Sequence, residues 1–474
     1  MTNRLRESLH TAAADVPVYP VHERAIATAR RTRRRTVVAT AATLVLVALA
    51  GAMLPGTSVV APAAGAGAAL PDRVGVPPFG SLHATDRPRI GPASVIFTGQ
   101  ADGLEWGDEG SIIAVVGAET DRYRIIKGEI EARAGEDTML SPDGRQVAFR
   151  EVNGWTRPRV EIVDLVTGHS RTIATGVSGT VMADPVAWSP DGHVLVVRDT
   201  VPANPERSAY THVLSLVWLD GDRRTRLAEA GDAEGLGSPV AFAPNGALLA
   251  YQNGRTVVVA NVDGRRLSSF DLAPDTELAG KGAWSTDSRT LTLAHRDGDR
   301  WSLRRVDAGP GMLLGEDRGA LDMPAVSGVT AIRLLGWAAD GSARVVAYQP
   351  APDAPAAFDV PLEMDQRLAY GNVGTVRVLA LGPGADAPTT LLVAPDGVVA
   401  IDVADNVIHS GRTRAANPPD GIGPRFWFWT FLVIVLLAAI VAYRCRRGLA
   451  LWLDDKRVRR TRRKGESRIH RPNG

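Results

Sequence analysis

The apolar residues of this chain gather in two long uncharged runs near its ends. Residues 36–54 (TVVATAATLVLVALAGAML) and 426–443 (FWFWTFLVIVLLAAIVAY) contain no charged side chain. As α-helices they would be about 27–29 Å long, which matches a hydrocarbon core of about 30 Å. Neither run has polar residues at the spacing of a soluble amphipathic helix, so we expect two transmembrane helices. For residues 36–54 the alternative is a cleaved signal peptide, which the long basic segment before them disfavours.

Between these runs, short apolar runs follow a five-residue string that recurs about every 48 residues. The copies are WSPDG at 188–192, LSPDG at 140–144, FAPNG at 242–246, WSTDS at 284–288, WAADG at 337–341, VAPDG at 393–397 and a weaker WGDEG at 106–110. The positions that anchor this repeat are Trp106, Gly110, Pro142, Asp143, Gly144, Trp188, Pro190, Asp191, Gly192, Phe242, Pro244, Asn245, Gly246, Trp284, Asp287, Trp337, Asp340, Gly341, Pro395, Asp396 and Gly397.

Each string has the chemistry of a strand that ends in a tight turn. A large apolar residue closes the strand, and Ser-Pro-Asp-Gly is typical of a type I turn. The β-branched run behind it predicts a returning strand, and further strands follow, as at 159–165 and 256–262. About four strands per repeat predict an all-β fold, a β-propeller. Seven strings favour seven four-stranded blades, with six as the alternative, and residues 93–99 are expected to complete the last blade and close the ring.

The Trp-Ser-Pro-Asp-Gly string and its apolar continuation resemble the repeat of TolB-like and WD-repeat-like (WD40) propellers over about residues 93–412. The resemblance implies a fold and no particular activity, because the string is a turn and not a site. The predicted order along the chain is a basic segment 1–35, a transmembrane helix 36–54, an Ala/Gly/Pro-rich linker 55–92, the propeller 93–412, a linker 413–425, a transmembrane helix 426–443 and a basic tail 444–474.

Charge is segregated along the chain. The net formal charge is +5 over residues 1–35 and +9 over residues 444–474, which leaves −12 for the middle of a chain whose total is +2. Because basic residues flank membrane helices on the cytoplasmic side, we expect both termini in the cytoplasm and the acidic middle outside it. A single cysteine, Cys445, excludes a disulfide framework. The heavy use of Ala, Arg, Gly and Val is typical of a high-GC bacterial genome.

The sequence holds no motif for catalysis, a cofactor or a metal ion. It lacks the Gly-x-Ser-x-Gly elbow of serine hydrolases and the phosphate-binding Gly-x-x-x-x-Gly-Lys loop, and its nine histidines have no metal-ligand spacing. The Asp-Gly-Asp strings at 220–222 and 297–299 are interpreted as hairpin turns rather than calcium ligands. Trp188, Trp284 and Trp337 are interpreted as packing between blades, with a sugar-binding platform as the alternative.

These features favour a non-enzymatic scaffold that binds a protein or another ligand on a propeller face while the lipid bilayer holds both chain ends. A second interpretation is a sensor that signals to residues 1–35, similar to an anti-sigma regulator. A third is an enzyme with a site in the central channel, which clustered inward-facing carboxylates would support. Nucleic-acid binding by the basic tail is disfavoured, because the positive-inside effect and anionic lipid account for its charge.

Overall fold

A computed structural model describes residues 68–77, 80–100, 111–126, 133–151, 158–174, 176–206, 209–221, 223–230, 239–308, 315–352, 373–419 and 426–444. Residues 60–426 belong to one compact unit and residues 427–444 to another, so each is described by itself. The predicted segment 1–35, the predicted helix 36–54, the string with Trp106 and Gly110, and the tail from residue 445 lie outside the described residues.

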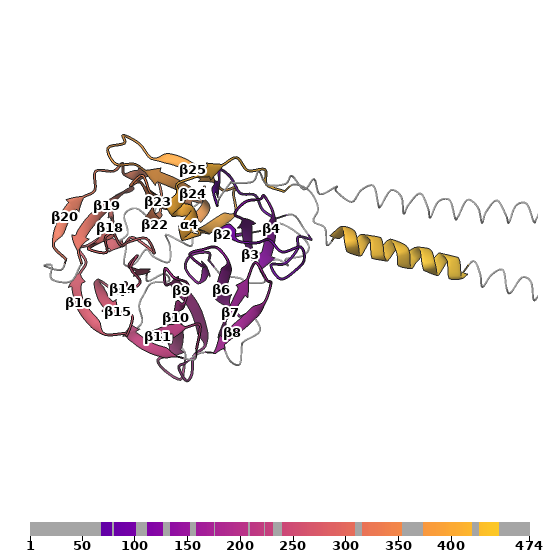
Figure 1. The fold of residues 1–474 in the computed structure, drawn as a ribbon, viewed down its shortest axis with the longest axis horizontal. Helices are drawn as coiled ribbons and strands as arrows, with labels where there is room; N and C mark the ends of the chain where they lie inside the picture. The colour runs from indigo at the N-terminus through magenta and orange to yellow at the C-terminus, as the bar shows by residue number, and fades with distance from the viewer. Residues whose placement is uncertain are drawn as a thin grey trace, which may run out of the picture. The chain divides into compact units, whose positions relative to one another are not determined.

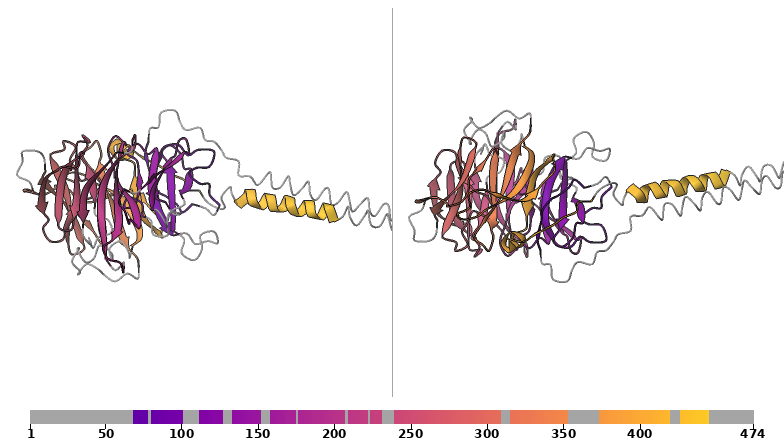
Figure 2. Two further views of the ribbon diagram at one scale, coloured as in Figure 1. Left: turned by 90° about the horizontal axis from the view of Figure 1, so that it is seen from below. Right: turned by 90° about the horizontal axis from the view of Figure 1, so that it is seen from above.

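Six antiparallel sheets surround a central axis as the blades of a propeller (Figure 1). Named from the axis outward, blade 1 is β26 (Val398–Val403), β2 (Ala93–Gln100), β3 (Ser111–Gly117) and β4 (Tyr123–Ile126); blade 2 is β5 (Thr138–Leu140), β6 (Gln146–Arg150), β7 (Arg159–Asp164) and β8 (Ser170–Ala174); blade 3 is β9 (Met182–Trp188), β10 (Val194–Pro202), β11 (Tyr210–Trp218) and β12 (Arg224–Ala230). Seen from the side, the strands run roughly along the propeller axis (Figure 2).

The other three blades continue in chain order around the ring. Blade 4 is β13 (Val240–Phe242), β14 (Leu248–Asn253), β15 (Thr256–Asn261) and β16 (Arg266–Asp271); blade 5 is β17 (Thr276–Leu278), β18 (Thr290–Asp297), β19 (Arg300–Asp307) and β20 (Asp317–Ala320); blade 6 is β22 (Ala331–Trp337), β23 (Ala343–Pro350), β24 (Val373–Leu381) and β25 (Thr389–Val393). A short fifth strand, β21 (Val326–Ser327), also pairs with β19 in blade 5.

The expectation of seven blades is wrong, and the six-blade alternative is correct. In blades 2 to 6 the string joins the innermost strand to the second strand. The string at 393–397 instead joins β25, the outermost strand of blade 6, to β26, the innermost strand of blade 1. The weak string at 106–110 lies between β2 and β3 of that same blade. Counting both strings therefore counted one blade twice.

Blade 1 closes the ring because it is assembled from both ends of the propeller chain. β26 pairs antiparallel with β2, with Val95 opposite Val403 and Phe97 opposite Ile401. Residues 93–99 thus close the ring, as expected, although they do so as the second strand of the first blade.

Residues 68–77 and 80–92, at the end of the segment expected to be a linker, contact the ring. β1 (Leu70–Pro71) pairs in parallel with β27 (Thr413–Arg414), so the segments that lead into and out of the propeller lie side by side. Leu70 and Val74 are buried in the core. These apolar contacts hold residues 70–74 against the ring.

The string at 188–192 shows why the repeat forms a turn. Ser189 Oγ donates to Asp191 Oδ1 at 2.5 Å. The backbone N–H of His193 also donates to Asp191 Oδ1, at 3.0 Å, and the backbone N–H of Val194 donates to Ser189 Oγ at 2.8 Å. Gly192 has φ of +72°, which glycine adopts without strain. Although burial raises the pKa of Asp191, the hydrogen bonds from Ser189 and His193 lower it below its ordinary value. The carboxylate therefore holds the hairpin closed.

The tryptophans at the head of three strings fasten neighbouring blades together. Each indole N–H donates to a backbone carbonyl of the preceding blade: Trp188 to Met139 at 3.4 Å, Trp284 to Ala241 at 3.1 Å and Trp337 to Gly282 at 3.0 Å. Trp188 and Trp284 are buried, and Trp337 is half-buried. The indole ring thus fills space between the blades while its polar atom finds an acceptor.

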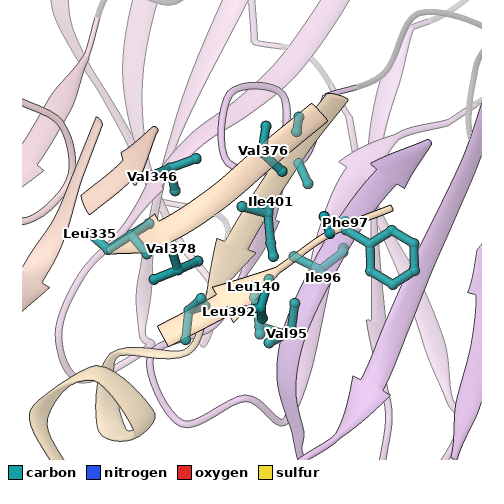
Figure 3. Close-up of a cluster of buried hydrophobic side chains, with 14 of the residues drawn as sticks. Val95, Ile96, Phe97, Leu140, Leu335, Val346, Val376, Val378, Leu392 and Ile401 are labelled. Carbon is teal, nitrogen blue, oxygen red and sulfur yellow. The ribbon is translucent and has the colours of Figure 1, made fainter. Parts of the chain in front are cut away.

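The largest apolar cluster fills the space where blade 1 meets blades 6 and 2 (Figure 3). Phe97 and Ile401 from blade 1 pack here with Val378 of blade 6 and Leu140 of blade 2, and all four are buried. Burial of these side chains against neighbouring blades is the main source of the ring's stability.

The described residues also include two helices. The short helix α4 (Asp405–Ser410) follows β26 and packs against β22, with Val407 and Ile408 buried. Among the described residues, one helix, Phe426–Arg444, has the length and composition needed to cross a membrane. It coincides with the predicted segment 426–443.

Candidate functional site

An arginine of blade 6 ties three blades together near the axis of the ring. Arg333, on the innermost strand β22, donates to the carbonyl of Ala134 at 3.3 Å and to the carbonyls of Gly135 and Ile401. Ala134 and Gly135 lead into blade 2, and Ile401 belongs to blade 1. Because a buried guanidinium has five N–H donors to satisfy, it suits a point where several main-chain carbonyls converge.

A lysine of blade 5 makes a second connection to blade 1. Lys281 Nζ lies 3.0 Å from Asp402 Oδ1 and 2.8 Å from Asp405 Oδ1, and it donates to the carbonyl of Val403 at 2.7 Å. The Asp402 side chain is fully buried. Burial lowers the pKa of Lys281, but the two carboxylates outweigh this and raise the pKa above its ordinary value. The lysine therefore stays charged.

Acidic side chains cluster between blades 2 and 3. Asp184 of β9 accepts from Arg150 Nε at 2.8 Å and Nη2 at 2.5 Å, and from Arg198 at 3.2 Å. Burial, and then repulsion from Asp184, raise the pKa of Asp137 to about 7, and burial raises the pKa of Glu136. Burial thus shifts both carboxyl groups toward the neutral form beside an ion-paired third.

Clustered carboxylates that face the channel are the criterion for an enzyme site there, and two acidic residues, Glu136 and Glu277, line a small cavity at the axis. A cavity of about 30 Å³ is lined by Glu136, Glu277, Lys281 and Arg333 among others. This volume holds about one water molecule. Lys281 and Arg333 therefore join blades beside this small axial cavity.

Larger hollows lie between blades, away from the axial cavity. The blade 5–6 groove has a volume of about 630 Å³, and its lining includes Arg305, Arg318, Met323, Trp337 and His409. Arg318 donates to the buried Asp307 at 2.5 and 2.8 Å. Two of the repeat strings contribute to this groove, one through Ser285 and Thr286 and the other through Trp337, Ala338, Ala339 and Gly341.

The blade 2–3 groove is larger, at about 980 Å³. It runs between the outermost strand β8 and the outer strands β11 and β12, and its lining includes Arg171, Ser178, Trp218, Arg224 and Arg226. Grooves of this size are large enough for a small ligand or a peptide segment.

The repeat anchors that lie in the described residues stand at strand ends and on the turns that join strands. The anchors of blades 2 to 6 are at the hairpin after the innermost strand, and Pro395, Asp396 and Gly397 lie between β25 and β26. The Asp-Gly-Asp string at 297–299 is the β18–β19 hairpin. No group of acidic, histidine or cysteine side chains suited to a metal ion occurs among the described residues.

The sequence analysis missed Lys281, Arg333 and Asp402. Arg333 and Asp402 each stand inside an otherwise apolar run, AIRLL at 331–335 and VVAIDV at 398–403. A charge within a buried strand needs a partner, and this signal could have marked both residues as axial. The groove residues carry no such signal, because β8 and β11 come together only in the folded ring.

No family model matches the chain, and no curated protein matches it in sequence. Solved structures similar to it include TolB from Acinetobacter baumannii (13% identity, 66% of this chain and 66% of that chain, TM-score 0.40) and an oligogalacturonate lyase in complex with manganese (13% identity, 67% and 77%, TM-score 0.39). A third similar structure is that of a prolyl endopeptidase (15% identity, 65% of this chain and 44% of that chain, TM-score 0.34). The chain thus spans just under two thirds of the TolB chain, and the likeness concerns the propeller fold alone.

Proposed function

We propose that this protein is a binding protein whose propeller is held outside the cytoplasm by a membrane helix at each chain end. The helix Phe426–Arg444 supports the C-terminal anchor, with exposed Phe428, Trp429 and Tyr443 near its two ends, where aromatic rings suit membrane interfaces. The N-terminal anchor rests on the apolar run 36–54 and the arginines before it. The basic flanks of both runs favour a propeller on the far side of the bilayer.

The observation that carries the binding role is the distribution of space in the ring. Lys281 and Arg333 join blades beside an axial cavity of about 30 Å³, whereas the grooves between blades offer about 630 and 980 Å³. Rigid blades that present a groove with exposed arginines and a tryptophan are suited to recognition. We therefore assign ligand or protein binding to the blade 5–6 and blade 2–3 grooves.

Filling each groove with a bulky side chain tests this assignment. Ala320 and Ala174 are exposed residues that line the blade 5–6 and blade 2–3 grooves. The full-length protein is cross-linked in cells, and partner recovery is compared for Ala320→Trp, Ala174→Trp and the control Ala247→Trp in the exposed β13–β14 turn. We expect saturable recovery that one groove variant abolishes and the control retains. If both groove variants recover the partner as well as the control does, the assignment is contradicted.

The predicted orientation can be read with the chain's only cysteine. Cys445 in the basic tail should react with a membrane-impermeant maleimide only after permeabilisation. In a Cys445→Ser background, Ala385→Cys on the propeller should react in intact cells or spheroplasts. The opposite pattern for the two positions overturns the proposed topology.

Signalling to residues 1–35 is a second candidate, because the flanking segments are fastened to blade 1 and to each other. The backbone N–H of Ala416 donates to Asp72 at 2.9 Å, and that of Asn417 donates to Asp121 at 2.8 Å. Arg414 also pairs with Asp121. A change in blade 1 would reach both segments together. Deletion of residues 1–30 should then alter transcription in cells, whereas a change in protein abundance alone would exclude this role.

A further inference from the structure

Two arginines cross the blade 2–3 groove in opposite directions. Arg171 of β8 donates to the carbonyl of Leu219 in blade 3 at 2.8 Å, and Arg224 of β12 donates to the carbonyl of Ala174 in blade 2 at 2.9 Å. Arg224 also lies 2.9 Å from Asp199, which is fully buried and balances its charge. Among the described residues no carboxylate pairs with Arg171.

Two further arginines add positive charge beside this crossing. The guanidinium of Arg223 lies 3.5 Å from the ring centre of Trp218, which lines the groove. Arg226 pairs with Glu229, but both side chains are more than half exposed. An exposed pair of this kind contributes little and exchanges readily for another anion. No aspartate or glutamate is found among the described residues that line the groove.

The floor of this groove includes the edge of a strand. β8 is the outermost strand of blade 2 and, in the described part of the chain, pairs only with β7. Four of its five residues are exposed, and Arg171 to Ala174 line the groove. An edge strand presents unpaired N–H and C=O groups, which can pair with an added chain.

We infer that the blade 2–3 groove binds an extended acidic peptide segment. The peptide main chain adds to the edge of β8, and its carboxylates meet Arg171 and Arg226, because guanidinium groups bind carboxylates in a bidentate manner. The strand edge favours a polypeptide over other polyanions, which would use the arginines alone. This inference rests on the proposed binding function and names the chemistry of its partner.

Binding of a synthetic peptide to the full-length protein in detergent micelles tests the inference. The probe is a fluorescent octapeptide of alternating Glu and Val, which can form an extended strand with all its carboxylates on one face. We expect saturable binding, measured by fluorescence anisotropy, that falls roughly tenfold or more in the double variant Arg171→Gln/Arg226→Gln. The matched control is the double variant Arg300→Gln/Arg304→Gln in blade 5, where Arg304 pairs with Asp317 as Arg226 pairs with Glu229.

Two comparison ligands separate strand addition from simple charge attraction. The same octapeptide with N-methyl groups on alternate amides should lose most of its affinity, and the Gln-Val octapeptide should not bind. Polyphosphate of equal charge that binds as tightly as the peptide, or an N-methylated peptide that binds unchanged, overturns the inference. Unchanged binding in the double variant does so as well. If the peptide does not bind but a groove variant no longer recovers a cross-linked partner, the proposed binding function is supported and this inference about the ligand is wrong.

Discussion

Lys281 Nζ lies 3.0 Å from Asp402 Oδ1, and this ion pair joins blade 5 to the strand that closes the ring. Asp402 is fully buried, and its Oδ2 also accepts the backbone N–H of Leu140 at 3.4 Å. One carboxylate thus connects blades 1, 2 and 5. Because such a charge is far from water, its partner decides whether it is tolerated.

Replacing Lys281 by Met should therefore destabilise the propeller strongly. The change leaves Asp402 buried without its cation, and losses of roughly 3–5 kcal/mol are typical of a broken buried pair. Urea denaturation followed by tryptophan fluorescence measures the effect. The double variant Lys281→Met/Asp402→Asn should recover part of the loss, and Arg265→Met on an exposed turn should change little. Equal stability of the wild type and the Lys281 variant would show that the pair is not structural.

Ser288 occupies the place that glycine holds in most of the repeat strings, and its φ is +57°. A side chain in this left-handed region is strained, so Ser288→Gly should stabilise the protein by about 1 kcal/mol. The matched reverse change is Gly192→Ser, at φ of +72°, which should destabilise it by a similar amount. Thermal unfolding of the two variants should move in opposite directions. A shift of the same sign in both would refute the strain argument.

Trp284→Phe tests the link between blades 4 and 5. The indole N–H donates to the carbonyl of Ala241 at 3.1 Å, and the side chain is buried. Phenylalanine keeps an aromatic ring but leaves the acceptor unpaired, which costs about 1–3 kcal/mol. Chemical denaturation gives the difference, with Trp218→Phe at the half-buried groove position as a control that should cost less.

The stability of the fold should decrease as the pH rises from about 4 to about 7. Burial, followed by repulsion from Asp184, raises the pKa of Asp137 to about 7 from an ordinary value of 3.8. Between these two pH values the folded state therefore keeps a proton that the unfolded chain has released. The stability that Asp137 contributes in this way is fully present below the pKa of the unfolded chain and is lost as the pH rises through the pKa of the folded state. The loss amounts to roughly 4 kcal/mol at most.

Asp137→Asn should remove much of this pH dependence, because the amide cannot ionise. It can still accept at Oδ1 the backbone N–H of Arg133, which lies 2.6 Å away in the native protein. The variant should match the wild type near pH 4 and exceed it in stability at pH 8, as measured by urea denaturation. A smaller slope of the same sign should remain, since burial also raises the pKa of Asp199, to about 6. Parallel pH profiles for variant and wild type would show that Asp137 does not titrate in this range.

The propeller could be predicted from the sequence because its repeat is local. Ser189, Asp191 and Gly192 make their turn within a few residues of one another, so the pattern alone indicates the hairpin. The number of blades could not be read in the same way. The strings in the closing blade lie nearly 300 residues apart, and the sequence does not show that they belong to one sheet.

The axial ion pairs and the grooves escaped prediction for a related reason. Lys281 and Asp402 are distant in the chain, and only ring closure brings them together. Arg171 and Arg224 belong to different blades, and each is an ordinary surface residue in its own strand. The groove that they share arises from the packing of two blades, so no periodic pattern in the sequence indicates it.

The pairing of β2 with β26 also determines when the ring can close during biosynthesis. The strand Ala93–Gln100 is made early, yet the strand that covers its inner edge, Val398–Val403, emerges about 300 residues later. Until then the nascent chain carries an open sheet edge and an incomplete ring, and both invite aggregation and proteolysis. A chain cut short before β26 cannot close, so ring closure doubles as a check that translation has reached the end of the propeller.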